Sequence, residues 1–144
     1  MILNTGQRTD IPAFFPEWLA NRIKEGFVLV RNPYNPGLVT RYEINPQVVD
    51  AIGFCTKNPE PFFPYMGLVK DFGQFWYLTI TPYEKDIEPG VPDKSEVIEA
   101  FKYLSRAVWV EACGWRYDPI YVDEKYTVDF HLRAFEKMAS ELDK

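Results

Sequence analysis

Cysteine, histidine and long apolar runs are scarce in this sequence of 144 residues. Its two cysteines, Cys55 and Cys113, are far apart and form no CxxC motif, so a disulfide framework is not expected. No apolar run approaches the roughly 20 residues of a membrane helix, and the first residues lack the basic and apolar regions of a signal peptide. These absences predict a cytoplasmic protein with no membrane partner.

The motifs of several large enzyme classes are also missing. There is no glycine-rich phosphate loop, no GxGxxG, no HExxH and no nucleophile elbow. The single histidine, His131, falls in a predicted helix and far from any predicted strand end, which argues against a catalytic role. Two cysteines are too few ligands for an iron–sulfur cluster. The residues alone therefore predict no metal site and identify no catalytic residue.

The composition provides what a folded core needs. Hydrophobic residues make up 47% of the chain and aromatic residues 17%, which argues against disorder. The length is typical of one domain, so we expect a single α/β domain over residues 1–144. The formal net charge of -5 argues against a partner held by bulk positive charge, such as DNA or a membrane surface.

Apolar runs alternate with segments of helical period. We expect strands near 1–6, 27–33, 51–55, 74–83 and 112–122, helices over 15–26, 92–108 and 127–144, and an irregular helix over 60–73. Four apolar residues in a row at 27–30 favour a strand buried on both faces. Alternating strands and helices predict a parallel sheet. The expected fold is α/β, either a partial (βα) barrel or an open parallel sheet of about five βα units with helices outside.

Polar residues follow the predicted strands. They are Arg8, Thr9, Asp10, Arg31, Asn32, Lys57, Asn58, Arg116 and Asp118. Because the carboxyl ends of parallel strands meet at one edge of a sheet, we expect these side chains to surround a common pocket. Its four cations and two carboxylates predict a small anionic or zwitterionic ligand. The alternative is that they are solvated loop charges, which is also our interpretation of Glu84, Lys85, Asp86 and Glu88.

Five segments in order carry a family resemblance: RTDIPAFF, VRNP, DAIGFCTKNPEP, TITPYEKDIEPGVP and WRYDPIYV. Together they resemble the N-terminal part of a bacterial family of domains of unknown function, numbered 1848. Members of that family resemble the spore photoproduct lyase branch of radical S-adenosylmethionine proteins. The resemblance implies a partial (βα) barrel, S-adenosylmethionine, and an iron–sulfur cluster bound by cysteines near the C-terminus of family members longer than this chain. We therefore expect a fragment, a truncated homologue or a half that pairs with something.

The resemblance carries over best to Arg116 and Asp118. Arg8, Thr9 and Asp10 come next, followed by Arg31, Asn32, Lys57 and Asn58. The cysteine group of the family and the CxxxCxxC motif of radical enzymes are both absent from this sequence. We therefore expect this chain alone to bind no cofactor, and the cluster and S-adenosylmethionine are implied by the resemblance only.

Three hypotheses for the function remain open. The first is the N-terminal α/β part of a radical-SAM-like iron–sulfur protein with a strand-end ligand pocket, for which a nucleic-acid substrate rests on analogy alone. The second is a non-catalytic binding or assembly module, a half-barrel completed by a homodimer or by a missing C-terminal half. The third is a metal-independent enzyme that acts on an acidic small molecule, with Asp10 or Asp118 as the base. The sequence does not decide whether the chain is an enzyme.

Overall fold

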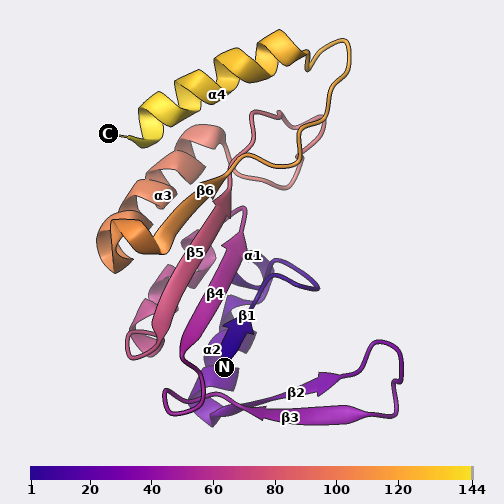
Figure 1. Ribbon diagram of the computed structural model, residues 1–144, viewed down its shortest axis with the longest axis vertical. Coiled ribbons are helices and arrows are strands. Elements are labelled where there is room, and N and C mark those ends of the chain that lie inside the picture. Colours follow the sequence, from indigo (N-terminus) through magenta and orange to yellow (C-terminus); the bar gives the residue numbers. More distant parts are fainter. Residues whose placement is uncertain (144) are drawn as a thin grey trace.

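Four parallel strands form the central sheet of the computed structural model, which describes residues 1–143. The strands are β1 (Ile2–Asn4), β4 (Ala51–Thr56), β5 (Gly73–Thr79) and β6 (Cys113–Arg116), and they lie side by side in that order (Figure 1). The sheet therefore adds each new strand on the same side of the previous one. The predicted α/β class with a parallel sheet is confirmed.

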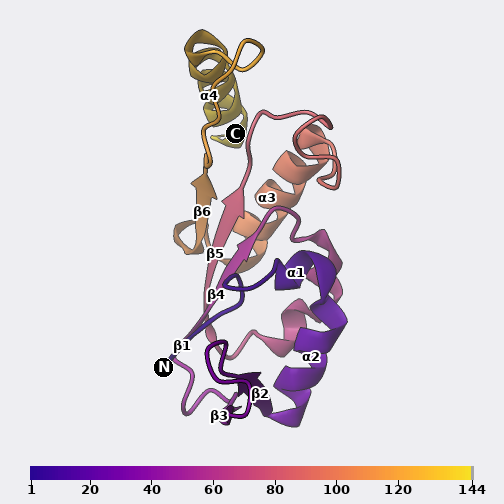
Figure 2. The ribbon, with the colours of Figure 1, turned by 90° about the vertical axis from the view of Figure 1, so that its right-hand side faces the viewer.

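The connecting helices lie together on one face of this sheet (Figure 2). They are α1 (Ile11–Phe14), α2 (Pro16–Glu25), the 3-10 helix η1 (Glu60–Leu68) and α3 (Lys94–Val108). Because crossovers between parallel strands are right-handed, strands laid down in chain order place every crossover on the same face. A second short 3-10 helix, η2 (Val110–Ala112), precedes β6, and α4 (Val128–Leu142) lies beyond the end of the sheet (Figure 1).

The helices begin and end where their capping residues predict. Pro16 opens α2, and Gly26 ends it in the left-handed conformation with φ 76°. The backbone N–H of Asp93 donates to the Glu96 carboxylate (3.3 Å), as the predicted capping-box spacing requires at the start of α3. None of the helices among the described residues is both long enough and apolar enough to cross a membrane.

The core lies between the sheet and its layer of helices. Phe54 on β4 and Trp76 on β5 are fully buried, and their rings stack with centroids 3.8 Å apart. Phe62 of η1 packs against both rings, at 5.4 Å and 6.0 Å. Aromatic pairs of this kind add about 0.5–1.5 kcal/mol beyond the burial of their area. The aromatic side chains of β4 and β5 therefore form the centre of the core.

The prediction that residues 27–33 form a strand of the parallel sheet was wrong. It forms β2 (Phe27–Arg31), which pairs antiparallel with β3 (Val39–Glu43) in a separate hairpin. Asn32 begins the connecting turn, because its Oδ1 accepts the backbone N–H groups of Tyr34 (2.8 Å) and Asn35 (3.1 Å). The chain therefore doubles back after Arg31. The parallel sheet has four strands where we expected five, and the hairpin lies beside its amino-terminal end (Figure 1).

The face of the sheet opposite the helices carries no helix of the described chain (Figure 2). Phe75 and Tyr77 of β5 lie on this face, with ring centroids 4.8 Å apart and about two fifths of each residue exposed. The ring of Tyr77 covers Gly114 of β6, where a Cβ would lie only 2.9 Å from it. We call this surface the uncovered face.

We predict that Gly6→Ala destabilises the fold. A Cβ at Gly6 would lie 2.5 Å from the Cβ of Cys55, which is attached to a rigid strand and cannot move alone. Overpacking of this kind costs about 1–3 kcal/mol in free energy of unfolding, which urea denaturation measures. Gly67→Ala is the control, because nothing lies within 4 Å of the position its Cβ would take. Equal stabilities of the two variants would contradict the prediction.

Candidate functional site

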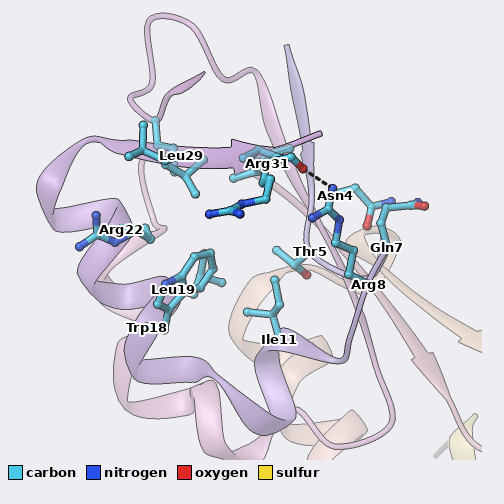
Figure 3. A pocket seen from close by; sticks show the side chains of 14 residues that line it. Asn4, Thr5, Gln7, Arg8, Ile11, Trp18, Leu19, Arg22, Leu29 and Arg31 are labelled. Carbon is cyan, nitrogen blue, oxygen red and sulfur yellow. Dashed lines mark hydrogen bonds between the residues drawn. The ribbon is translucent and has the colours of Figure 1, made fainter. Parts of the chain in front are cut away.

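The structure divides the expected ring of polar residues into three places. Arg8 and Arg31 lie together beside β1 and the hairpin (Figure 3). Lys57 lies after β4 in the middle of the edge, and Arg116 and Asp118 lie at the end of β6. Since β6 is two strands away from β4, these groups do not converge on one ligand-sized point. The ligand-binding role of each residue remains a prediction.

A cavity of about 410 Å³ lies between β1, α1, α2 and the hairpin, with Arg8 and Arg31 on its wall. The Nη2 of Arg8 donates a hydrogen bond to the backbone carbonyl of Arg31 (2.8 Å), which ties the loop after β1 to the end of β2. The side chain of Arg31 extends into the cavity, near Leu19 and Trp18 of α2 (Figure 3). The displacement of β2 from the sheet thus forms a wall of this cavity.

The lining of the cavity is cationic and otherwise largely apolar. Arg8, Arg22 and Arg31 are among its lining residues, although the Arg22 guanidinium lies over the ring of Phe27 (5.7 Å) and extends away from the cavity (Figure 3). No aspartate or glutamate lines the cavity among the described residues. Polar neutral groups come from Asn4, Thr5 and Gln7. The remaining lining residues are Leu3, Ile11, Trp18, Leu19, Val28, Leu29, Val30 and Ile44. The cavity is therefore suited to an anion that carries an apolar portion.

Asp10 has a structural position at the sheet edge. Its Oδ1 accepts the backbone N–H of Ala13 (3.1 Å) and so caps α1, and its Oδ2 accepts the backbone N–H of Lys57 (2.8 Å). Thr9, beside it, is half-buried. Because both carboxylate oxygens of Asp10 already accept backbone N–H groups, this residue is poorly suited to act as a base. Instead it fixes the loop after β1 to the end of β4.

Lys57 is held by Glu88, whose side chain is only 9% exposed. Glu88 accepts hydrogen bonds from the Nζ of Lys57 (2.6 Å) and the Oγ1 of Thr81 (2.8 Å), and it also pairs with Lys94. Burial raises the pKa of Glu88, but these three donors outweigh burial and hold the pKa below its ordinary value. Interpreting Glu88 as a solvated loop charge was wrong. The sequence places a lysine and a glutamate after two adjacent strands, but their separation of 31 residues does not identify them as partners.

Asn58 and Asn32 both support turns of the backbone. The Oδ1 of Asn58 accepts the backbone N–H of Glu60 (3.2 Å) at the start of η1, in the same manner as Asn32 in the hairpin turn. At the far edge of the sheet, the Nε of Arg116 donates to the Oγ1 of Thr79 (3.0 Å) and lies 3.9 Å from the Oδ2 of Asp118. Both side chains of this ion pair are half-exposed or more. Arg116 is therefore oriented, and its remaining N–H donors face solvent-accessible space.

His131 lies close to the segment after β6, so our expectation that it is far from any strand end was wrong. It is buried, and its Nε2 must carry the proton because it contacts the carbonyl of Tyr121 (2.8 Å). The hydroxyl of Tyr117 therefore donates to its Nδ1 (2.8 Å). Burial, with a smaller contribution from Tyr83, raises the pKa of Tyr117 to about 12. His131 holds the 117–121 segment against α4.

The two cysteines do not fit a shared metal or iron–sulfur site. Cys55 is opposite Tyr77 in the sheet, on the uncovered face, and Cys113 is opposite Trp76, on the face that the helices cover. Their side chains therefore leave the sheet in opposite directions. Burial raises the pKa of the Cys113 thiol to about 11, so it is protonated at neutral pH. Within residues 1–143, no three histidine, cysteine or acidic side chains form a group that could hold a metal ion.

Comparison with known proteins gives one match. The family described as Domain of unknown function (DUF1848) matches residues 2–144, which is almost the whole chain. A search of the curated proteins and a search of the solved structures found no match. The expected resemblance to this family is confirmed, whereas the link to radical S-adenosylmethionine proteins stays a prediction.

We predict that Glu88→Gln lowers the free energy of unfolding by about 1.5–3 kcal/mol, the range for hydrogen bonds to a charged group. The amide would leave Lys57 and Lys94, each about two thirds buried, without their counter-charge. Glu99→Gln is the control, because Glu99 is 71% exposed in its ion pair with Lys102 and should change stability little. Urea denaturation of both variants measures the difference.

The same residue predicts a pH dependence. Because the folded-state pKa of Glu88 lies below the ordinary value of 4.5 for a glutamate, its ionised form stabilises the fold above that pH. This stabilisation is lost as the pH falls through the folded-state pKa. We expect the melting temperature of the wild type to fall more steeply than that of Glu88→Gln in acid. Parallel pH profiles of the two proteins would show that Glu88 has no such role.

Proposed function

This chain belongs to the family described as Domain of unknown function (DUF1848), and from that premise we propose that it is a ligand-binding α/β unit. The ligand is a small anionic or zwitterionic molecule, bound in the cavity beside Arg8 and Arg31. The observation that carries the proposal is the hydrogen bond from Arg8 to the carbonyl of Arg31, which joins two cationic residues on the wall of one cavity. These are two of the four cations that the sequence indicates as an anion site.

The chemistry of arginine supports this proposal. A guanidinium group presents a planar fork of N–H donors that matches a carboxylate or a phosphate. The bond to Arg31 holds Arg8 in place before any ligand arrives, which lowers the entropy cost of binding. The buried side chains of Leu19, Val28 and Ile44 exclude water from part of the cavity. Arg8 and Arg31 themselves are exposed, so the cavity is open to solvent on their side.

We further propose, from the resemblance, that the chain is the α/β part of a radical-SAM-like protein and a portion of a (βα) barrel. Two features support this proposal. The strands of the parallel sheet follow one another in the order of the sequence, and Arg116 and Asp118 lie at the carboxyl end of β6. The described residues do not fit an iron–sulfur cluster, because the two cysteines leave the sheet on opposite faces. We therefore assign this chain no step of radical chemistry, and ligands for a cluster would have to come from other residues.

We predict that Arg31→Ala and Arg8→Ala each weaken ligand binding by about tenfold or more, the value of one charge-assisted hydrogen bond. The probes are octanoate, adenosine monophosphate and S-adenosylmethionine, measured by isothermal titration calorimetry. Arg41→Ala is the matched control, because Arg41 lies on the same hairpin but pairs with Glu43 and does not line the cavity. If none of the three probes binds the wild type, the proposal is wrong.

The exposed surface of the chain favours a second candidate function, an assembly module. Its accessible area is 9022 Å², whereas a compact monomer of this mass exposes only about 7,700 Å². The excess of about 1,300 Å² exceeds the roughly 800 Å² that each partner buries in an interface of standard size. The uncovered face supplies an aromatic centre, Phe75 and Tyr77, and a more polar rim that includes Arg116. We propose that a second copy of the chain covers this face.

The oligomeric state tests this second candidate. We expect multi-angle light scattering to give the mass of a dimer, and Tyr77→Glu to convert it to a monomer because a carboxylate would be buried without a partner. The control is Tyr34→Glu, since Tyr34 is 96% exposed near the turn of the hairpin and away from the sheet. A monodisperse monomer at high micromolar concentration would rule out the second copy.

A further inference from the structure

We infer that the cavity selects an amphipathic anion, a single acidic group on an apolar body, and that it discriminates against zwitterions and cations. The inference rests on the proposed function, since it names the class of ligand for the same cavity. It goes further, because the proposal admits both anions and zwitterions. Two independent features of the cavity carry it, the sign of its charges and the chemistry of its walls.

The charges of the cavity are of one sign. Arg8, Arg22 and Arg31 line it, and no described acidic residue does. Of the acidic residues on the segments around the cavity, Asp10 accepts the backbone N–H groups of Ala13 and Lys57, Glu43 pairs with Arg41, and Glu17 and Glu25 of α2 are exposed and do not line the cavity. An ammonium or sulfonium group would enter beside the guanidinium groups of Arg8 and Arg31, with no acidic residue on the described lining, and it would lose hydration. The acidic group of a zwitterion would therefore be attracted to the cavity, whereas its cationic group would be repelled, which lowers the net affinity.

The apolar side chains on the walls of the cavity favour a ligand whose remaining portion is hydrocarbon. Leu19 and Ile44 are each 3% exposed, and with Val28 they form a buried apolar surface opposite the cationic groups. Leu3 and Ile11 extend this surface from β1 and α1. These side chains have no hydrogen-bonding atoms, so a ribose, a base or a peptide group placed there would lose its hydrogen bonds to water. An aliphatic or aromatic portion would instead gain about 0.8 kcal/mol for each methylene removed from water, or about fourfold in affinity.

The position of Arg31 brings the two features together. Its backbone carbonyl is held by Arg8, while its side chain extends past the apolar wall into the cavity (Figure 3). Trp18 and Leu19 lie close to this side chain in the same view. An acidic group bound to Arg31 therefore leaves the rest of the ligand against Trp18 and Leu19. The volume of about 410 Å³ is at the lower end of the range for small-molecule sites, which fits a ligand of modest size.

The test compares ligands that differ in only one property. Octanoate, octanol and octylamine share a chain and differ in charge, while hexanoate and octanoate share a charge and differ by two methylenes. Isothermal titration calorimetry on the full chain is expected to give octanoate at least tenfold tighter binding than octanol or octylamine. Hexanoate should bind roughly fifteenfold more weakly than octanoate, given about fourfold for each of the two methylenes. S-adenosylmethionine should bind more weakly than octanoate.

Two variants separate specific binding from adventitious binding. Arg31→Ala keeps the backbone carbonyl that Arg8 binds, so the fold should survive, and octanoate affinity should fall at least tenfold. Arg41→Ala, on the same hairpin, should leave octanoate affinity unchanged. Thermal melts of both variants verify folding, and if Arg31→Ala is unstable, suppression of octanoate binding by competing hexanesulfonate tests the anion requirement on the wild type.

The possible results of these titrations separate the further inference from the proposed function. Octanoate binding that depends on charge, chain length and Arg31 supports the inference. Tighter binding of S-adenosylmethionine, also lost in Arg31→Ala, would overturn the inference and leave the proposed function standing. Equal binding of octylamine and octanoate would show an unselective apolar surface and overturn the inference. The absence of binding by every probe would overturn both.

Discussion

Crossovers between parallel strands take one hand, and in this chain the strands are added to the sheet in the order of the sequence. Together these two constraints place α1, α2, η1 and α3 in a single layer. They also bring the carboxyl ends of all four strands to one edge, along which Asp10 and Lys57 lie together and Arg116 lies at a separate point. The same arrangement leaves the other face without helices, so the aromatic side chains of β5 stay in contact with solvent. Both candidate functions follow from this distribution of covered and uncovered surface.

The elements that could be predicted from the sequence are those whose signals are local. The helix from Lys94 to Val108 has its cap at Asp93 and its apolar residues on one face, and both signals lie within a few turns. The strand at 73–79 is rich in aromatic residues and has a clear alternation. By contrast, the run at 27–31 is equally apolar, but its pairing depends on the turn at Asn32 and on the strand at 39–43 that follows this turn. Composition alone does not tell a buried parallel strand from a hairpin strand.

The candidate site shows the same limit in another form. Of the four cations that the sequence analysis placed around one pocket, Arg8 and Arg31 lie together, and the ligand-binding role of all four stays a prediction. The spacing of residues could not show that Lys57 forms an ion pair with Glu88, because the two are 31 residues apart in the sequence. The loop after β5 brings Glu88 to Lys57 only in the folded structure. Nor could it show that the carboxylate of Asp10 accepts hydrogen bonds from the backbone N–H groups of Ala13 and Lys57. What was missing in each case was the identity of the hydrogen-bond partner, which depends on the tertiary fold.

The cavity has one property that concerns the history of such a protein more than its chemistry. Every residue that lines the cavity lies between Leu3 and Ile44, whereas the rest of the sheet is built from residues 51–116. The two parts are joined by the pairing of β1 with β4, by the contacts of α1 and α2, and by the hydrogen bond from the backbone N–H of Lys57 to Asp10. Leu19, Val28 and Ile44 of the cavity lining belong to the same core as Phe54 and Trp76, whereas Arg8, Trp18 and Arg31 do not. Substitutions of the latter three residues can therefore reshape the cavity without reaching the stacked rings. A lineage with this architecture can diverge in what it binds while its scaffold stays the same.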